Sequence, residues 1–111
     1  MKLYGFSKKE RIRRQKDFLA LLKEGERKQT PHFVVFIRPN TLPYARLGIR
    51  VGRKVGKAVQ RNRLRRLIRE FFRQNKYKIG CYDIIIAAKG SAAALNYHQV
   101  CEELSNILCV K

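Results

Sequence analysis

Arginine and lysine side chains crowd one segment of the chain, and their spacing fits contacts with a polyanion. The stretch Val55–Glu70 reads VGKAVQRNRLRRLIRE. Its apolar residues recur at spacings of three and four, which predicts an amphipathic helix. The apolar face holds Leu64, Leu67, Ile68, Phe71 and Phe72, and the opposite face holds Asn62, Arg66, Arg69 and Arg73. Because guanidinium groups bind phosphate oxygens in pairs, this second face is predicted to dock a polyanion.

Residue types that could cut RNA are scattered by comparison. A nuclease site in the polypeptide would need clustered carboxylates for two metal ions, or a paired histidine for acid–base work. Asp17, Glu70 and Asp83 fall on separate predicted elements, and His32 and His98 show no partner in the sequence. We therefore predict no catalytic residue, no metal ligand and no cofactor bound by the protein alone. Asp17 is expected to stabilise the first helix or a neighbouring arginine.

The charge balance of the whole chain points to the same kind of partner. There are 26 Lys and Arg residues against 8 Asp and Glu, a net charge of +18 on 111 residues. No acidic residue lies between Glu26 and Glu70. Such a field repels itself and favours a partner of opposite sign, for which nucleic acid is the natural candidate. A membrane surface is disfavoured, because the basic helix backs onto bulky apolar residues and no lipidation signal is present.

Length and cysteine content narrow the class further. We expect one domain over residues 1–111, because 45% hydrophobic residues suffice for a core. The first residues lack the apolar run of a signal peptide. Cys81, Cys101 and Cys109 are odd in number and have no CxxC spacing, which favours reduced thiols in a cytoplasmic protein and leaves a zinc site as the alternative.

Apolar periodicity predicts helices packed on one sheet, an α+β sandwich. Ser7 is a possible cap of the first helix, Gly25 its stop, and Asn96 the cap of the last helix. The run at 82–88 is apolar throughout, which suits a central strand covered on both faces. Helices are expected at residues 8 to about 24, about 57 to 75 and 96–109, and strands at 32–38, 45–51 and 82–88.

The first predicted strand, HFVVFIR, has two apolar faces. Phe33, Val35 and Ile37 point one way, and Val34 and Phe36 point the other. Either both faces are covered, or one is an apolar platform for a ligand. From the residues alone, ordinary core packing is the favoured explanation of Phe18 and Phe36.

The basic segment closely resembles the signature of the bacterial ribonuclease P protein subunit, and the order of elements resembles that family over essentially the whole chain. The motif residues are Lys54, Gly56, Ala58, Val59, Arg61, Asn62, Arg63, Arg66 and Arg69. The resemblance implies the fold of the second domain of ribosomal protein S5, a two-layer sandwich in the order α-β-β-β-α-β-α. It also implies a fourth strand, near Arg27–Thr30 or from a split of the second, and a left-handed β-α-β crossover that contains the RNR helix.

The same resemblance implies a function. The family's holoenzyme is an endonuclease that removes the 5′ leader from precursor tRNA, and its catalyst is a large RNA with bound Mg²⁺. This protein would bind that RNA, one protein per RNA, together with the precursor tRNA. A structural RNA-binding ribosomal protein of the same fold is the alternative. A DNA-binding module ranks third, because no helix-turn-helix or zinc spacing is present.

Individual roles follow from the same resemblance. Two positions depart from the family pattern: Leu22 stands where many members carry a second Phe, and Ala88 where many carry Arg. The residues implied to face the catalytic RNA are Lys54, Lys57, Arg61, Asn62, Arg63, Arg65, Arg66 and Arg69. Those implied to line the leader-binding cleft are Phe18, Leu22, Phe36, Arg50 and Lys89, where aromatic rings would stack on unpaired bases of any sequence.

Overall fold

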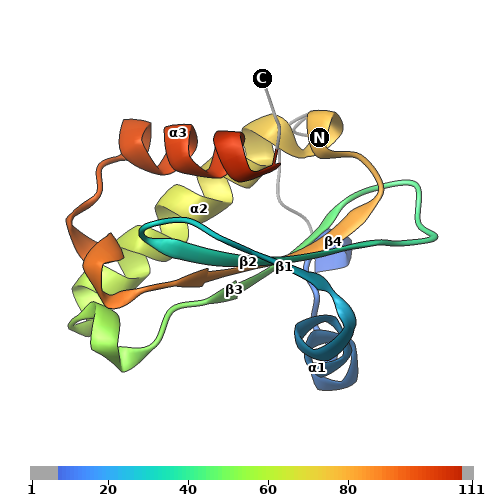
Figure 1. Ribbon diagram of the computed structural model, residues 1–111, viewed down its shortest axis with the longest axis horizontal. Coiled ribbons are helices and arrows are strands. Elements are labelled where there is room, and N and C mark those ends of the chain that lie inside the picture. The colour runs from blue at the N-terminus through green and yellow to red at the C-terminus, as the bar shows by residue number, and fades with distance from the viewer. Residues whose placement is uncertain (1–7, 109–111) are drawn as a thin grey trace.

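The computed structural model describes residues 8–108, so the cap expected at Ser7 and the thiol of Cys109 lie outside the described residues. Seven helices and strands follow one another in the predicted order (Figure 1). They are α1 (Gln15–Glu24), β1 (Glu26–Gln29), β2 (Phe33–Pro39), β3 (Arg46–Arg50), α2 (Ala58–Ile79), β4 (Tyr82–Ala88) and α3 (Tyr97–Leu108). Short 3₁₀ turns are η1 (Lys8–Glu10), η2 (Arg53–Val55) and η3 (Gly90–Ala94).

The four strands form one mixed sheet in the order β1-β2-β4-β3. β1 pairs antiparallel with β2, and β2 antiparallel with β4, whereas β3 and β4 are parallel and joined through α2. The fourth strand is therefore the short segment near Arg27, and the apolar run at 82–88 is a central strand as expected. The parallel β3-α2-β4 connection is the crossover that the resemblance implies, and its left hand stays a prediction.

Helices cover both faces of this sheet unequally. α2 and α3 lie on one face and α1 on the other (Figure 1). The main core lies under α2 and α3, where Phe33, Leu64, Phe71, Ile84 and others are fully buried. The sheet with α2 and α3 forms the two layers of the predicted α+β sandwich. α1 lies on the second face and leaves part of it without a covering helix (Figure 1).

The first helix begins later than predicted, at Gln15 rather than at residue 8. Residues 11–14 are extended instead: Arg11 bridges Leu47 in parallel, and the Ile12 amide donates to the Leu47 carbonyl at 3.0 Å. Ile12 is buried, so this segment extends the sheet beyond β3. Gly25 ends the helix as expected, its amide donating to the Leu21 carbonyl at 2.8 Å.

The other two helices differ less from the expectation. α2 continues to Ile79, and Gly80 ends it with a φ of 85°, a value that glycine adopts without strain. The extra turn includes Lys76, whose ammonium is buried against Glu10 at 2.7 Å. Asn96 caps α3 as predicted: its Oδ1 accepts from the Gln99 amide at 2.8 Å, and the Gln99 side chain accepts from the Asn96 amide at 2.9 Å.

Candidate nucleic-acid interface

The first candidate surface is the basic face of α2 and the turn before it, called the RNR face. Its residues lie on η2, at Lys57 just before α2, and on α2 as far as Arg69. They face away from the core because the other side of the helix is buried through Leu64 and Ile68. Five of its side chains are exposed and three are half-buried. The exposed ones are Lys54, Lys57, Asn62, Arg63 and Arg66, and the half-buried ones are Arg61, Arg65 and Arg69.

Arg65 and Arg61, two of the half-buried arginines, differ in their hydrogen bonding. Arg65 is fixed by donating to Asn62 Oδ1 at 2.8 Å and to the Val51 carbonyl at 3.2 Å, which ties the helix to the end of β3. The buried Nε of Arg61 has no hydrogen-bond partner within the described part of the chain. A buried donor without a partner is costly, so an added acceptor such as a phosphate oxygen would stabilise it.

The only carboxylate of α2 is neutralised within the helix. Glu70 accepts hydrogen bonds from Arg73 and from Gln74, the latter at 2.9 Å. These bonds, from Arg73 first, hold the pKa of Glu70 below its usual range. Arg73, predicted for the basic face, is thus engaged by Glu70, and the RNR face keeps its positive charge.

The second candidate surface, called the aromatic cleft, lies on the α1 face of the sheet. Phe18 and Leu22 of α1 and Phe36 of β2 pack around buried Ile85, each partly exposed. A Cβ on Gly48 would come within 2.8 Å of the Phe18 ring, so only glycine lets the ring lie this close to β3. The structure therefore brings together the three apolar cleft residues named from the sequence.

An uncovered row of the sheet continues this cleft. Val34, Ala87 and Arg50 are aligned across β2, β4 and β3, one row beyond Phe36 and Ile85. Val34 and Ala87 are half-buried and Arg50 is exposed. Small apolar side chains beside a cation and two phenyl rings suit a single-stranded nucleic acid, whose bases stack while its phosphates meet cations.

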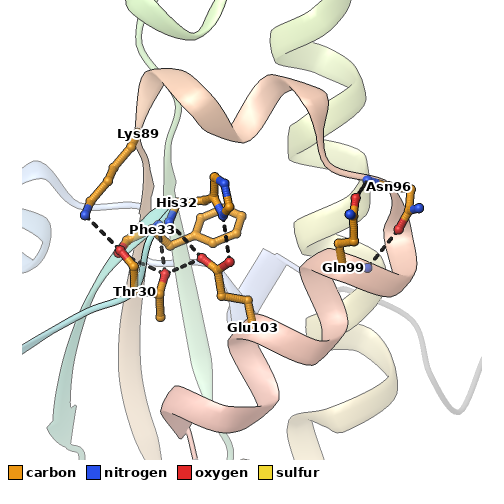
Figure 2. A network of polar contacts seen from close by, with 7 residues as sticks. All are labelled: Thr30, His32, Phe33, Lys89, Asn96, Gln99 and Glu103. Carbon is orange, nitrogen blue, oxygen red and sulfur yellow. Dashed lines mark hydrogen bonds and ion pairs between the residues drawn. The ribbon is translucent and has the colours of Figure 1, made fainter.

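Lys89 follows the last residue of β4, and its side chain extends toward Thr30 (Figure 2). Its amide donates to the His32 carbonyl at 2.9 Å, and its ammonium donates to the Thr30 carbonyl at 2.8 Å. The side chain is half-buried and bound to the turn between β1 and β2. Lys89 is thus bound by the turn between β1 and β2, and its role in the cleft stays a prediction.

A carboxylate that the sequence did not point to organises the same turn. Glu103 of α3 accepts from the Thr30 hydroxyl, from the His32 amide at 2.9 Å and from His32 Nδ1 at 2.8 Å (Figure 2). Burial would raise the pKa of Glu103, but the hydrogen bonds from His32 and Thr30 outweigh it and lower the pKa. The expectation that His32 has no partner was wrong, because its partner lies 71 residues away. His98 also has one, Glu102 at 3.6 Å.

Two further carboxylates meet at an arginine. Arg46 donates to Asp83 at 2.6 and 2.9 Å, and Asp17 lies 3.7 Å from the same guanidinium. Asn40 donates to Asp83 at 2.9 Å. Burial raises the pKa of Asp83, but the bonds from Arg46 and Asn40 hold it below its usual range. Of the two roles expected for Asp17, the contact with an arginine is present, but the sequence gave no sign that Asp83 shares that arginine.

The two departures from the family pattern have different locations. Leu22 lies in the aromatic cleft, where it takes part in the contacts around Ile85. Ala88 is buried in the main core, on the face of β4 that α2 and α3 cover. Only the departure at Leu22 therefore changes the surface of the cleft.

Two features are absent from residues 8–108. No three His, Cys, Asp or Glu side chains gather there where they could hold a metal ion. In the same part of the chain, no helix is both long and apolar enough to cross a membrane.

Comparisons with known proteins agree with this geometry. The model of the ribonuclease P protein family matches residues 6–110. The ribonuclease P protein component of Syntrophus aciditrophicus is 44% identical over 97% of this chain and 92% of its own. Among solved structures, the Thermotoga maritima ribonuclease P protein superposes with a TM-score of 0.80 at 40% identity, covering 89% of this chain and 94% of that one.

A Staphylococcus aureus ribonuclease P protein mutant, described as defective in mRNA degradation activity, superposes with a TM-score of 0.87. It is 35% identical, over 94% of this chain and 92% of that one. These relatives are ribonuclease P proteins rather than ribosomal proteins. This chain belongs to the ribonuclease P protein family, and is a protein subunit of the ribonucleoprotein endonuclease that matures the 5′ ends of tRNA.

Proposed function

We propose that the RNR face binds the catalytic RNA of ribonuclease P and that the aromatic cleft binds the 5′ leader of precursor tRNA. One observation carries this assignment: Arg65 and Arg69 of the RNR face and Phe18 of the cleft line the same hollow, of about 210 Å³, at the edge of β3. A surface that suits folded RNA thus adjoins one that suits a single strand. One protein can then hold both RNAs against each other.

The stoichiometry, the location and the chemistry are further parts of the proposal. We propose one protein per catalytic RNA in the cytoplasm, with Mg²⁺ held by the RNA. The protein's own contribution is to bring cations between two polyanions and to hold the leader, so it supplies no reacting group. The mRNA degradation named for the Staphylococcus aureus relative is, for this chain, a separate question that an RNA-free assay answers.

The RNR face is tested by the double variant Arg66→Ala/Arg69→Ala. Each arginine that neutralises a phosphate should contribute about 0.7–0.9 to the slope of log K against log salt, so the double variant should lose about 1.4–1.8. The measurement is a filter-binding salt titration with the catalytic RNA. Arg73→Ala is the matched control, since Arg73 lies on the same helix but is engaged by Glu70. Wild-type slopes in the double variant would rule out the assignment.

The aromatic cleft is tested by Phe36→Ala in the reconstituted enzyme. Loss of one stacking platform should weaken binding of precursor tRNA by about 1–3 kcal/mol per base and leave binding of mature tRNA unchanged. Phe33→Ala is the control, because Phe33 lies on the same strand but is fully buried in the main core. That variant should lose about 3–5 kcal/mol of stability and retain leader discrimination in the folded fraction. If Phe36→Ala behaves like Phe33→Ala, Phe36 serves packing alone.

A further inference from the structure

A second basic hollow lies beside the N-terminal segment, away from the RNR face. It has a volume of about 520 Å³ and lies between that segment and Tyr44 and Arg46. Five of its cations are exposed side chains of residues 8–14. They are Lys8, Lys9, Arg11, Arg13 and Arg14.

The acidic side chains near this hollow do not neutralise it. Asp17 is its one carboxylate, and it faces Arg46, which Asp83 already pairs. Lys9 lies over the Tyr44 ring at 5.3 Å. Within residues 8–108, Lys8, Lys9, Arg13 and Arg14 form no ion pair. Like charges held this close favour a polyanion.

The backbone holds these cations in place. The bridge between Arg11 and Leu47 aligns the segment with β3, and the buried pair of Glu10 and Lys76 fixes η1 against α2. Side chains on a fixed backbone lose less entropy on binding than those of a free tail. The backbone that carries these cations is therefore already ordered in the free protein.

The position of the hollow connects it to the RNR face. Arg11 also lines the hollow that contains Arg65 and Arg69, so the cations continue from the N-terminal segment to the RNR face. The open row of the aromatic cleft, at Val34 and Arg50, lies on the other side of the Phe18–Gly48 contact. Phe18 of the aromatic cleft lines the hollow at the RNR face as well, so the row of cations passes beside the cleft on its way from the N-terminal segment to the RNR face.

We propose that this N-terminal hollow binds the sugar–phosphate backbone of the catalytic RNA, as a second contact beyond the RNR face. The inference rests on the proposed function of the RNR face and extends its footprint along β3. It assigns a role to the residues that the sequence placed in the first helix.

The test is the double variant Arg13→Gln/Arg14→Gln in the intact protein. Lys23→Gln/Lys78→Gln removes the same charge from two exposed lysines outside both hollows. With the catalytic RNA, the arginine variant should weaken binding about tenfold near 0.1 M salt and lower the salt slope by about 1.4–1.8. The lysine control should stay near wild type. Thermal melting should be unchanged in both, because all four side chains are exposed.

Each other outcome overturns the inference. Equal losses in the two variants would mean a general effect of net charge. Loss of leader-dependent binding alone would assign the hollow to precursor tRNA. Wild-type binding by the arginine variant, with weakened binding by Arg66→Ala/Arg69→Ala, would refute the hollow and leave the proposed function standing. Wild-type binding by both would refute the proposed function itself.

Discussion

Bacterial ribonuclease P RNA at low Mg²⁺ is expected to cleave precursor tRNA when this protein is added, and the protein without RNA is expected to cleave nothing. The reason is charge. Six or more phosphate contacts change RNA affinity by on the order of 10³ between 50 and 200 mM salt. Cations of the +18 chain can therefore replace part of the Mg²⁺ that holds two RNAs together. Cleavage should rise well above that of the RNA alone, scored by release of the 5′ leader.

The control experiment tests His32, for which the sequence showed no partner. His32 lies 2.8 Å from Glu103, a shorter histidine–carboxylate distance than the 3.6 Å between His98 and Glu102, so it is the histidine to test for acid–base chemistry. His32→Asn keeps a donor near Glu103 and removes the imidazole, so it should leave holoenzyme cleavage unchanged. RNA-free protein is also assayed on an unstructured mRNA fragment. Cleavage there that His32→Asn abolishes would place catalysis in the polypeptide.

Glu10→Gln is expected to destabilise the protein by about 3–5 kcal/mol, because it breaks a buried ion pair by removing the carboxylate charge beside the ammonium of Lys76. The two side chains are only 9% and 7% exposed and lie 2.7 Å apart. A loss of this size should lower the melting temperature by more than about 10 °C in a domain of this length. Circular dichroism during heating measures it.

Two further variants test whether the loss of stability comes from breaking a buried ion pair or from removing any carboxylate. Glu102→Gln removes a carboxylate that is 67% exposed beside His98, and should leave the melting temperature nearly unchanged. Glu10→Gln/Lys76→Met removes both charges and should recover most of the loss, since an apolar replacement of a buried pair is often neutral. An unchanged melting temperature in Glu10→Gln would show that the pair does not hold η1 to α2.

Local patterns predicted most of the fold. The apolar run at 82–88 has the bounds of β4, and the alternation in β2 correctly separated Phe33 from Phe36. The start of the first helix was wrong, because residues 11–14 pair with β3, and backbone pairing across more than thirty residues leaves no local periodicity. The helix-forming composition of that segment was overridden by a contact distant in sequence.

Site residues were predictable to the degree that a motif marked them. The arginines of α2 and the two phenyl rings could be named because of their spacing and the family resemblance. Glu103 and Asp83 could not, because each finds its basic partner through the folded chain, 71 and 37 residues away. The N-terminal cations were visible as charge, but their alignment along β3 depends on the same long-range pairing.

The central position of β4 has a consequence for the making of the protein. β1, β2 and β3 leave the ribosome first, yet β2 and β3 are joined only through β4, the last strand to be synthesised. The four-stranded sheet therefore cannot be completed until residue 88 has emerged. α2, which carries the RNR face, is synthesised before β4 and α3, which complete the core that α2 packs on. Such dependence on distant contacts slows folding. An RNA that binds only the closed form would favour completion by mass action, which couples maturation of the subunit to assembly of its enzyme.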